Sequence, residues 1–493
     1  MLHKREFSSP LLTWLFQFSV LLFKPFWSCL SALVSVCIAT TFERRRAWIL
    51  FFKRTLSISP LLVLCLLFLP FGIVGFIIRC ILYNVFRNPY RLSIKHSSFN
   101  VQSCKRINEY GVATLNFCLL PEFLSRFNNL SDTHSRAKEI GQKIILDQMF
   151  YGQRNDVNDN EEIQLSPRRR SINNNPATVT TGITTHFPNL EFLCIQEVWQ
   201  SNYSDILVEE LHKIYPYVIR DVGIYGRDSN YFLLNSGPLT TGLMFASKYE
   251  ILEVDFKYFR TSCNHCVYSG KGLLMIKVLL WYEDIRTEKA VVGYLYSTQL
   301  QAYQGKVKVN DKQLDDILKW TKEFRETTKR ASDLIAFDIL SGDFNFDNIS
   351  PGDKTVSEHE LFDFYRDEGR QSPGTDHHWT VGTEMRQHYL YEEEVATPEG
   401  LKKCLEAPLL RQQYIVDADI EEASLDSIVY ALPKTEICPV GGKRRIDLIL
   451  YHVDYPVIPT RYNFVTRLTR LTDHIPVTMN FNPLYVTYLY QPT

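Results

Sequence analysis

The chain has 493 residues, enough for two domains or for one large domain with additions. Its formal net charge is −1 at pH 7, so no overall basic excess indicates a nucleic-acid-binding protein. The 11 Cys are odd in number and scattered, which argues against the disulfide framework of a small secreted protein and favours a reducing compartment.

The N-terminal segment 1–95 is rich in apolar runs and predicts a membrane anchor. Three runs lack charged residues, between Glu6 and Lys24, between Lys24 and Glu43, and between Arg54 and Arg79. The third is long enough to cross about 30 Å of hydrocarbon, and a removable signal peptide would not contain several such blocks in succession. Basic residues flank the runs on both sides, so the positive-inside rule gives no single orientation. A hairpin or re-entrant anchor with both ends in the cytosol fits this pattern better.

Basic residues beside these runs predict contact with anionic phospholipid head groups, at about 1 kcal/mol for each residue near the surface. They are Arg44-Arg45-Arg46, Lys53-Arg54, Arg79, Arg87, Arg91 and Lys95. Four Cys in or beside the runs are candidate palmitoylation sites, although for each one the interpretation as a small apolar residue is favoured. These are Cys29, Cys37, Cys65 and Cys80.

From about residue 112 the pattern changes to that of a mixed α/β domain, which we place at 96–493. The expected strands are 113–120, 190–199, 242–254, 272–282, 291–301, 334–347, 444–452 and 472–481. The expected helices are 131–150, with Ser131 or Asp132 as its N-cap, 204–215 and 311–330. The Asn-, Thr- and Arg-rich segment 152–185 is expected to be a disordered insertion. Alternating strands and helices followed by strand pairs predict two packed sheets with helices outside.

Polar residues recur at the ends of these apolar strands. They are Asn116, Glu197, Lys271, Asp343 with Asn345, Asp447, and Asp473-His474. Residues two apart on an extended chain share a face, so Asp343 and Asn345 of SGDFNFDN would stand side by side at the edge of a sheet. A single strand-end carboxylate such as Glu197 would by default face water. Six such sites in apolar strands together predict one polar cluster.

The residue types in this set suit the hydrolysis of a phosphodiester. A carboxylate such as Glu197, together with neutral oxygen donors, suits Mg²⁺, which keeps water ligands and neutralises phosphate charge. Asn116 and Asn345 are expected to donate hydrogen bonds to phosphate oxygens or to position water. Asp343 is a candidate to orient or deprotonate the attacking water. His474 needs a partner that fixes its tautomer, and Asp447 is the right type of group.

The motifs LCIQEVW, SGDFNFDN, RRIDLIL and TDHIPV together resemble those of the endonuclease/exonuclease/phosphatase superfamily. That resemblance implies the DNase I-like fold, a four-layer α/β/β/α sandwich. LLPEFLSRFNNLSDTHSRAKEIGQKI, GLMFASKY, the Lys271 segment and the apolar N-terminus are similar to those of the membrane-anchored neutral sphingomyelinases. The resemblance covers nearly the whole chain except 152–185. Because that insertion is short, the chain looks more like the mitochondria-associated type than the neutral sphingomyelinase 2 type.

This resemblance implies a hydrolase that uses Mg²⁺, or Mn²⁺ as an alternative ion, and cuts sphingomyelin into ceramide and phosphocholine. It also implies activation by anionic phospholipid, and a catalytic domain facing the cytosol at a Golgi, endoplasmic reticulum, plasma or mitochondrial membrane. By matching motifs, Glu197 and Asn116 would bind the metal, and Asn116 and Asn345 the substrate. The implied catalytic residues are His474, Asp343, Asn345, Lys271, Asp447 and Asp473. Lys271 would match the lysine of an activation switch.

Two positions depart from the family pattern. Gln299 ends the strand GYLYSTQLQA where many family members have a His that stabilises the phosphate or protonates the leaving alkoxide. An amide has no proton to deliver, and general acid catalysis contributes roughly 10²–10⁴-fold, so the enzyme could be slow, specialised or inactive. Cys266 stands where neutral sphingomyelinase 2 has an Asp, five residues before the switch lysine, so the usual partner of Lys271 is missing.

Two alternatives to sphingomyelin hydrolysis stay open. Gln299 motivates a catalytically weak or silent lipid-binding scaffold of the same fold. A different phospholipid substrate, such as a lysophospholipid, would keep the chemistry, whereas nucleic acid is disfavoured because the catalytic portion has no marked excess of Lys and Arg. Cys263 and Cys266 lack a second ligand pair nearby, which disfavours structural zinc. The glycosylation sequon at Asn348 directly follows SGDFNFD, where a glycan would crowd the strand end, and this favours a cytosolic location.

Overall fold

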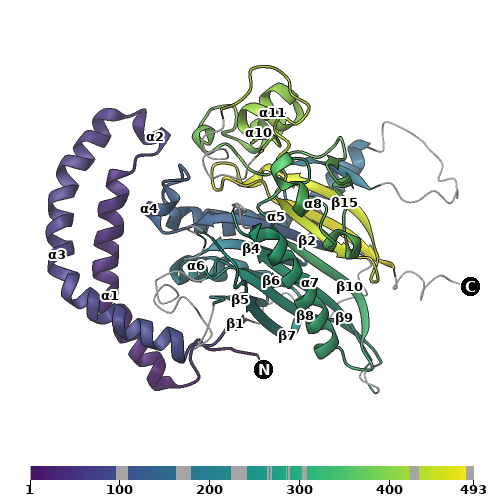
Figure 1. Cartoon of the computed structure of the whole chain (residues 1–493), viewed down its shortest axis with the longest axis horizontal. Coiled ribbons are helices and arrows are strands. Elements are labelled where there is room, and N and C mark those ends of the chain that lie inside the picture. Colours follow the sequence, from purple (N-terminus) through teal and green to yellow (C-terminus); the bar gives the residue numbers. More distant parts are fainter. Residues whose placement is uncertain are drawn as a thin grey trace, which may run out of the picture.

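Two β-sheets packed face to face form the centre of the molecule. The computed structural model describes residues 2–95, 109–162, 179–223, 241–263, 266, 269–284, 286, 289–302, 308–421 and 432–484. The larger sheet has eight strands in the order β1-β5-β6-β4-β2-β16-β15-β3, and the smaller has six in the order β11-β14-β10-β9-β8-β7. Helices cover the outer faces, so the catalytic part has four layers (Figure 1). The expected α/β/β/α sandwich with an apolar helical segment before it is confirmed.

The strands are of ordinary length for a globular domain. Those of the larger sheet are β1 (Arg91–Ile94), β2 (Tyr110–Leu119), β3 (Thr180–Thr184), β4 (Phe192–Val198), β5 (Tyr217–Arg220), β6 (Met244–Ser247), β15 (Val457–Val465) and β16 (Val477–Pro483). Those of the smaller sheet are β7 (Glu250–Tyr258), β8 (Gly272–Asp284), β9 (Lys289–Gln299), β10 (Leu334–Asp343), β11 (Tyr365–Asp367) and β14 (Asp447–His452). A separate ribbon pairs β12 (Arg370–Ser372) with β13 (Thr375–Asp376).

Helices lie outside the sheets and at the N-terminus. The N-terminal helices are α1 (Pro10–Cys37), α2 (Thr41–Arg44) and α3 (Ala47–Val85). The remaining α-helices are α4 (Glu122–Ser125), α5 (Thr133–Glu162), α6 (Ser201–Leu211), α7 (Val309–Thr328), α8 (Lys354–Ser357), α9 (Leu361–Phe364), α10 (Pro398–Glu406) and α11 (Pro408–Tyr414). Helices α5, α6 and α7 therefore overlap the expected helices 131–150, 204–215 and 311–330, and α1 and α3 contain the apolar runs.

The core follows from the alternation of side chains along each strand, which gives every strand two faces to bury. Aromatic residues of facing strands fill the space between the sheets: Tyr110, Phe192, Phe245, Phe337 and Phe481. Helices α5 and α6 cover the outer face of the larger sheet with Ile140, Ile144, Leu207 and Leu211. Helix α7 covers the smaller sheet with Leu314, Ile317 and Phe324. Because both faces of both sheets are buried, the strands read as apolar runs with polar ends.

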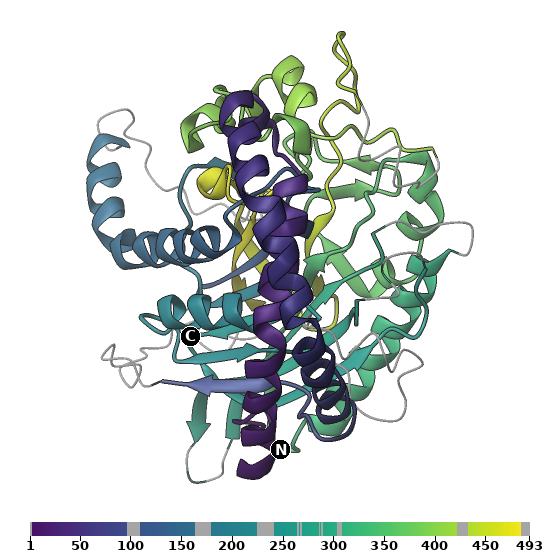
Figure 2. The same ribbon diagram turned by 90° about the vertical axis from the view of Figure 1, so that its left-hand side faces the viewer.

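The N-terminal helices form an antiparallel hairpin beside the sandwich, with the short helix α2 at its turn (Figure 1). Helix α1 and residues 47–83 are each long and apolar enough to cross a membrane by length and composition. The two helices approach closely at Gly75, where an added Cβ would lie 2.7 Å from the backbone of Phe23 and Ser19. Helix α3 bows around α1 and contains Pro60 and Pro70, residues that bend helices. The hairpin runs across one face of the sandwich (Figure 2).

The hairpin contacts the sandwich at both of its ends. At the open end, Arg87 binds Glu6 and the carbonyl oxygen of Asp221, and β1 pairs with β5. At the turn, Asn129 accepts a hydrogen bond from the Thr41 N–H at 2.7 Å, and within α1 Trp27 packs edge-on against Phe123 of α4. Both ends of the apolar hairpin are therefore held against one folded unit.

The structure corrects part of the expected lipid-binding set. Arg79 is buried and donates a hydrogen bond to Tyr83, and Arg87 is buried in the contact described above. Neither side chain is available to lipid head groups. Arg79 binds another residue of the anchor, and Arg87 binds both the anchor and the sandwich. Cys65 and Cys80 are buried as well, whereas Cys37 is exposed.

Several expected elements differ from those observed: the strands expected at 334–347, 444–452 and 472–481 are Leu334–Asp343, Asp447–His452 and Val477–Pro483 in the structure. The segment 242–254 is not one strand, because β6 joins the larger sheet and β7 the smaller. The Ser247 hydroxyl bonds both the N–H and the carbonyl oxygen of Tyr249 and closes the turn between them. Helix α5 begins at Thr133, after Asp132, but the carboxylate that binds its first N–H groups is that of Glu122 rather than an N-cap side chain.

The expected disordered insertion 152–185 is too long. Helix α5 continues to Glu162, and residues 180–184 form β3, which pairs in parallel with β15 at the sheet edge. Residues 163–178 lie outside the described part of the chain. Pairing with an edge strand gives hydrogen-bond partners to the backbone N–H and C=O groups of this Thr-rich segment. The amino-acid composition of the segment does not show that such a partner strand exists.

Candidate active site

The ends of six strands meet at one rim of the sandwich and bring the expected polar residues together. Strands β2 and β4 run parallel, as do β9 and β10, so each pair ends at the same edge. Asn116, Glu197, Gln299 and Asp343 lie at these ends. In the register of the smaller sheet, Asp343 stands between Gln299 and Asp447. Alternation decides which face each side chain points to, and the direction of the paired strands decides at which edge it lies. The second property depends on strand pairing, which the local sequence does not show.

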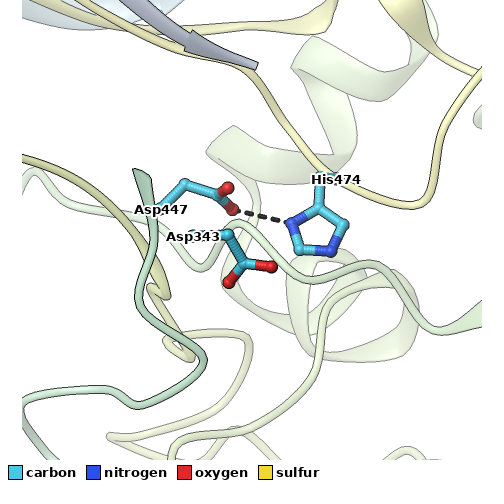
Figure 3. A group of neighbouring side chains, drawn as sticks. All are labelled: Asp343, Asp447 and His474. Atoms are coloured by element: carbon cyan, nitrogen blue, oxygen red, sulfur yellow. Dashed lines mark hydrogen bonds and ion pairs between the residues drawn. The ribbon is translucent and has the colours of Figure 1, made fainter. Parts of the chain in front are cut away.

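His474 and Asp447 form a hydrogen-bonded pair at this rim. The His474 Nδ1 lies 2.8 Å from Asp447 Oδ2, and the ring faces Asp343 as well (Figure 3). The other ring nitrogen, Nε2, lies 3.4 Å from the Asn116 amide nitrogen. Because Asp447 engages Nδ1, it orients the ring and leaves Nε2 as the atom that faces the site.

An amide bridge joins the two carboxylates of the opposite wall. Gln299 Nε2 donates to Glu197 Oε1 at 2.7 Å and to Asp343 Oδ2 at 3.3 Å. The same Asp343 oxygen accepts a hydrogen bond from Asn116 at 3.0 Å. Gln299, which the sequence presents as a departure from the family pattern, therefore lies at the centre of the cluster and holds two acidic groups in register.

Lys271 and Asn345 meet at a backbone carbonyl rather than at a carboxylate. Lys271 Nζ and Asn345 Nδ2 both donate to the carbonyl oxygen of Leu300, at 2.6 and 3.0 Å. The Asn345 N–H also binds Asp343 Oδ1 at 3.0 Å. The residue in the switch-carboxylate position, Cys266, is buried, so Leu300 provides the observed anchoring point for the lysine.

Backbone strain marks the rim. Glu197 and Asn345 have φ angles of 62° and 55°, in the left-handed region that side chains with a Cβ rarely adopt, and Cys118 beside Asn116 has a φ of 48°. Gly242, with a φ of 81°, lies so close to Glu197 that an added Cβ would be 3.2 Å from its backbone. Strain of this kind persists where the surrounding structure fixes it and is concentrated at functional sites.

Burial and neighbouring charge shift the ionisation of three groups. Burial raises the pKa of Glu197, to which Asp473 adds, and burial likewise raises the pKa of Asp343, to which Asp447 adds. Burial alone would lower the pKa of His474, but the charge and hydrogen bond of Asp447 raise it well above its ordinary value. These directions are those of a site with an excess of negative charge, which a divalent cation would relieve.

The donor set fits a hard metal ion. Asp343, Asp447 and His474 offer ligand atoms within 4.8 Å of one another. Within the described ranges, the buried oxygens Gln299 Oε1, Asp447 Oδ1 and Asp473 Oδ1 have no hydrogen-bond donor. Buried oxygens without donors are costly unless a cation or water satisfies them. The sequence expectation named Glu197 and Asn116 as ligands, and both lie in the same cluster through their contacts with Gln299 and Asp343.

Asp473 and Arg444 complete the surroundings. Asp473 Oδ2 accepts a hydrogen bond from Gln387 at 3.0 Å, so this carboxylate is held at the edge of the cluster. Arg444 is fully buried and donates to the carbonyl oxygen of Asn345 while it binds the carboxylates of Asp347 and Glu384. Sequence reasoning missed Arg444 as a support, although two consecutive arginines at the start of an apolar strand were a signal for it.

Comparison with known proteins gives the chain its relatives. No protein-family model matches it. It is 30% identical to sphingomyelin phosphodiesterase 5 of Danio rerio over 93% of this chain and 94% of that protein. It is 35% identical to human sphingomyelin phosphodiesterase 3, but that match covers 60% of this chain and 45% of the human protein.

Solved structures of low sequence identity align with about three quarters of the chain. A beta toxin from Staphylococcus aureus has a TM-score of 0.40 at 15% identity and covers 75% of this chain and 99% of its own. Sphingomyelinase C from Streptomyces griseocarneus has a TM-score of 0.38 at 14% identity and covers 76% and 100%.

Proposed function

The chain belongs to the sphingomyelin phosphodiesterase family, and from this premise we propose that it hydrolyses sphingomyelin to ceramide and phosphocholine at a membrane surface in a Mg²⁺-dependent reaction. The observation that supports the proposal most strongly is the convergence of Asn116, Glu197, Asp343 and His474 on one rim. These residues are scattered over more than 350 positions of the sequence, and a phosphodiesterase needs such groups within reach of one phosphorus atom.

The charges of the site fit this chemistry. Four carboxylates lie in or beside the cluster, and the cations that act on Glu197 and Asp343 are His474 and Lys271. A divalent ion held by Glu197 with Asn116 and neighbouring oxygens would neutralise phosphate charge during hydrolysis. Mn²⁺ would be accepted by the same oxygen donors.

Residues of the chain would position the attacking water and bind the phosphate. Asp343 faces His474, orients the attacking water and accepts its proton. The water oxygen forms the new bond to phosphorus while the bond to the ceramide oxygen breaks. His474 Nε2, kept at the site by Asp447, and the amide of Asn345 bind the phosphate oxygens. Lys271 supports this arrangement through the Leu300 carbonyl. Gln299 has no proton to give, so the leaving alkoxide takes its proton from water.

The anchor geometry supports attachment to one face of a membrane. We assign residues 1–95 to the anchor and 96–493 to the catalytic domain. A 28-residue helix is about 42 Å long, yet both ends of the hairpin contact the sandwich. A hairpin that crossed the bilayer would carry its turn away from the domain, so we propose a re-entrant anchor, which enters the membrane only from the side on which the domain lies. Exposed apolar side chains along α3, among them Leu62, Leu66 and Val74, would face the acyl chains.

Two sequon asparagines support a cytosolic location of the domain. The Asn129 amide nitrogen donates to Thr41 and Gln387, and that of Asn348 donates to Ser372 and Asp376. Glycosylation of either nitrogen would break contacts that the fold uses. Arg44 and Arg46, both exposed at the hairpin turn, would bind anionic lipid head groups.

Phosphocholine release from sphingomyelin vesicles tests the proposed function. The full chain is expected to release phosphocholine with Mg²⁺ and to lose activity in EDTA. An Asp343→Ala variant is expected to lower kcat by at least about 10²-fold, because it loses the group that orients water. Release by the parent no greater than by this variant would contradict the proposal.

Gln299 favours a second candidate, a catalytically weak or silent lipid-binding protein of the same fold. Vesicle binding that depends on Arg44 and Arg46, without turnover of any phosphodiester, would support it. A lysophospholipid in the same assay distinguishes a changed substrate from a lost activity. The intact cluster around Gln299 favours the hydrolase.

A further inference from the structure

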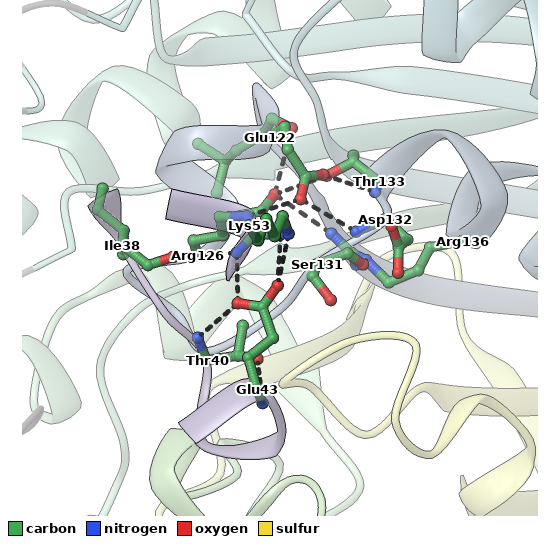
Figure 4. Close-up of polar contacts among 12 residues, drawn as sticks. Ile38, Thr40, Glu43, Lys53, Glu122, Arg126, Ser131, Asp132, Thr133 and Arg136 are labelled. Carbon is green, nitrogen blue, oxygen red and sulfur yellow. Dashed lines mark hydrogen bonds and ion pairs between the residues drawn. The ribbon is translucent and has the colours of Figure 1, made fainter. Parts of the chain in front are cut away.

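One polar network connects the turn of the membrane hairpin to the sandwich through Arg126 (Figure 4). Arg126 forms two hydrogen bonds with the carboxylate of Glu43, at 2.6 and 3.2 Å, and a third with the carbonyl oxygen of Ile38 at 3.0 Å. Its remaining nitrogen binds Glu122 at 2.9 Å. Only 6% of the Arg126 side chain is exposed, so water competes little for these contacts.

Glu122, which binds Arg126, also binds the N-terminus of helix α5. One carboxylate oxygen accepts the Asp132 N–H at 3.1 Å, and the other accepts the Thr133 N–H and hydroxyl, both at 2.9 Å. These are the groups that a helix N-terminus leaves without intrahelical partners. The position of Glu122, which Arg126 fixes, therefore sets where α5 begins.

One turn into α5, Arg136 reaches the active-site strands. It donates to the carbonyl oxygens of Leu471 at 2.6 Å, Cys118 at 2.9 Å and Phe117 at 3.3 Å, and also binds the Ser125 hydroxyl. Arg136 is buried, and its fork of donors joins the end of β2 to the segment before β16.

The two backbone segments that Arg136 joins carry Asn116 and His474. Between them, the Thr472 hydroxyl donates to the carbonyl oxygen of Asn116 at 2.7 Å and accepts the His474 N–H at 3.2 Å. The Cys118 N–H in turn binds Asn116 Oδ1 at 3.0 Å. The contacts thus run without interruption from Glu43 in the anchor to two residues that face the proposed phosphate.

We propose that Arg126 and Arg136 are positioning residues, through which docking of the anchor turn on α4 holds Asn116 and His474 in their catalytic geometry. The proposal rests on the proposed function for its kinetic consequence only. The turn that carries Glu43 also carries the exposed Arg44, Arg46 and Phe42, whereas the Arg126 side chain that Glu43 binds is buried. Anchor docking and active-site order are then reciprocally coupled.

Amide hydrogen exchange of the full chain in detergent micelles tests the coupling without substrate. The variants are Glu43→Gln and Arg126→Gln. The matched control is Glu392→Gln, which removes a second ion pair at this interface, between Arg45 and Glu392 at 2.5 Å, but touches none of the network. Residues 116–119 and 471–475 are expected to exchange about 2- to 30-fold faster in the two network variants and unchanged in the control. Unchanged exchange in both segments, or equal acceleration in the control, would overturn the proposal.

Kinetics with sphingomyelin in mixed micelles provide a second readout. Each network variant is expected to lower kcat by about 2- to 30-fold with little change in KM, because substrate binding at the micelle surface does not depend on the contact. The double variant is expected to match the single variants rather than to multiply their effects. Multiplied effects, or a loss confined to KM, would contradict coupling through this pair. If the parent shows no hydrolysis, the proposed function fails while the exchange measurement still decides this proposal.

Discussion

At the scale of single residues, Gln299 joins the two acidic groups Glu197 and Asp343 of the site. Its Nε2 bridges Glu197 and Asp343, and its Oε1 is buried without a donor in the described structure. A neutral amide holds two carboxylates together without adding a charge or a titrating proton. Gln299 therefore fixes the geometry of the two carboxylates and supplies no group that could protonate a leaving alkoxide.

Replacement of Gln299 separates these two roles. Gln299→His is expected to raise kcat, by up to about 10²-fold, because an imidazole can donate to a carboxylate and also protonate the leaving alkoxide. Gln299→Leu, which has similar size and no donor, is expected to lower kcat because the two carboxylates lose their bridge. Phosphocholine release measures both. A kcat for the His variant at or below that of the parent would show that the leaving group needs no acid here.

At the scale of elements, the four-residue helix α2 both forms the hairpin turn and binds the sandwich. Its capping box, Thr40 with Glu43, forms the hairpin turn, and the same Glu43 carboxylate binds Arg126 and Lys53. Burial would raise the pKa of Glu43, but these two cations lower it from 4.5 to about 2. A local turn thus carries the contact that docks the anchor.

The pH dependence of stability follows from that lowered pKa. A carboxyl group whose pKa is depressed by folding stabilises the folded state above its unfolded pKa of about 4.3, and this contribution is lost as the pH falls towards 2. The parent is therefore expected to melt at a higher temperature than Glu43→Gln at pH 7. The gap is expected to narrow between pH 5 and pH 3 in thermal unfolding of the two proteins in micelles. A gap that does not change with pH would exclude Glu43 as its origin.

At the scale of the whole molecule, the helical hairpin of the anchor runs along one side of the catalytic domain (Figures 1 and 2). The hairpin turn and the open end both contact the sandwich, so a membrane that covers the outer face of the hairpin meets the domain along its side. The rim that carries Asn116 connects to the turn through Arg126, Glu122 and Arg136.

Labelling of Cys37 tests this orientation. Cys37 is exposed at the end of α1 next to the turn. In sealed vesicles with the catalytic domain outside, a membrane-impermeant maleimide is expected to modify it, and Cys37→Ser is expected to show one adduct fewer. A hairpin that spans the bilayer would carry Cys37 to the lumen, and the two proteins would then be labelled equally.

The sequence by itself determined the elements and the residue types of the site. Apolar runs with polar ends indicated buried strands, because periodicity is a local property. The strand expected at 334–347 ends at Asp343, however, and Asn345 lies beyond it with a φ of 55°, so strand alternation does not set the position of Asn345. The resemblance of the strand-end motifs to those of a known family indicated the fold and the relatives of the chain. Local patterns failed at β6 and β7, since their division between two sheets depends on which partner each strand finds.

Only the tertiary structure decided what joins these parts. The bridging role of Gln299, the support from Arg444 and the path from Glu43 to His474 all depend on contacts between residues far apart in the chain. Such contacts arise when sheets and helices pack, and a buried arginine takes whichever carbonyls and carboxylates the packing leaves near it. Sequence therefore specifies which groups are present, whereas packing specifies which of them meet.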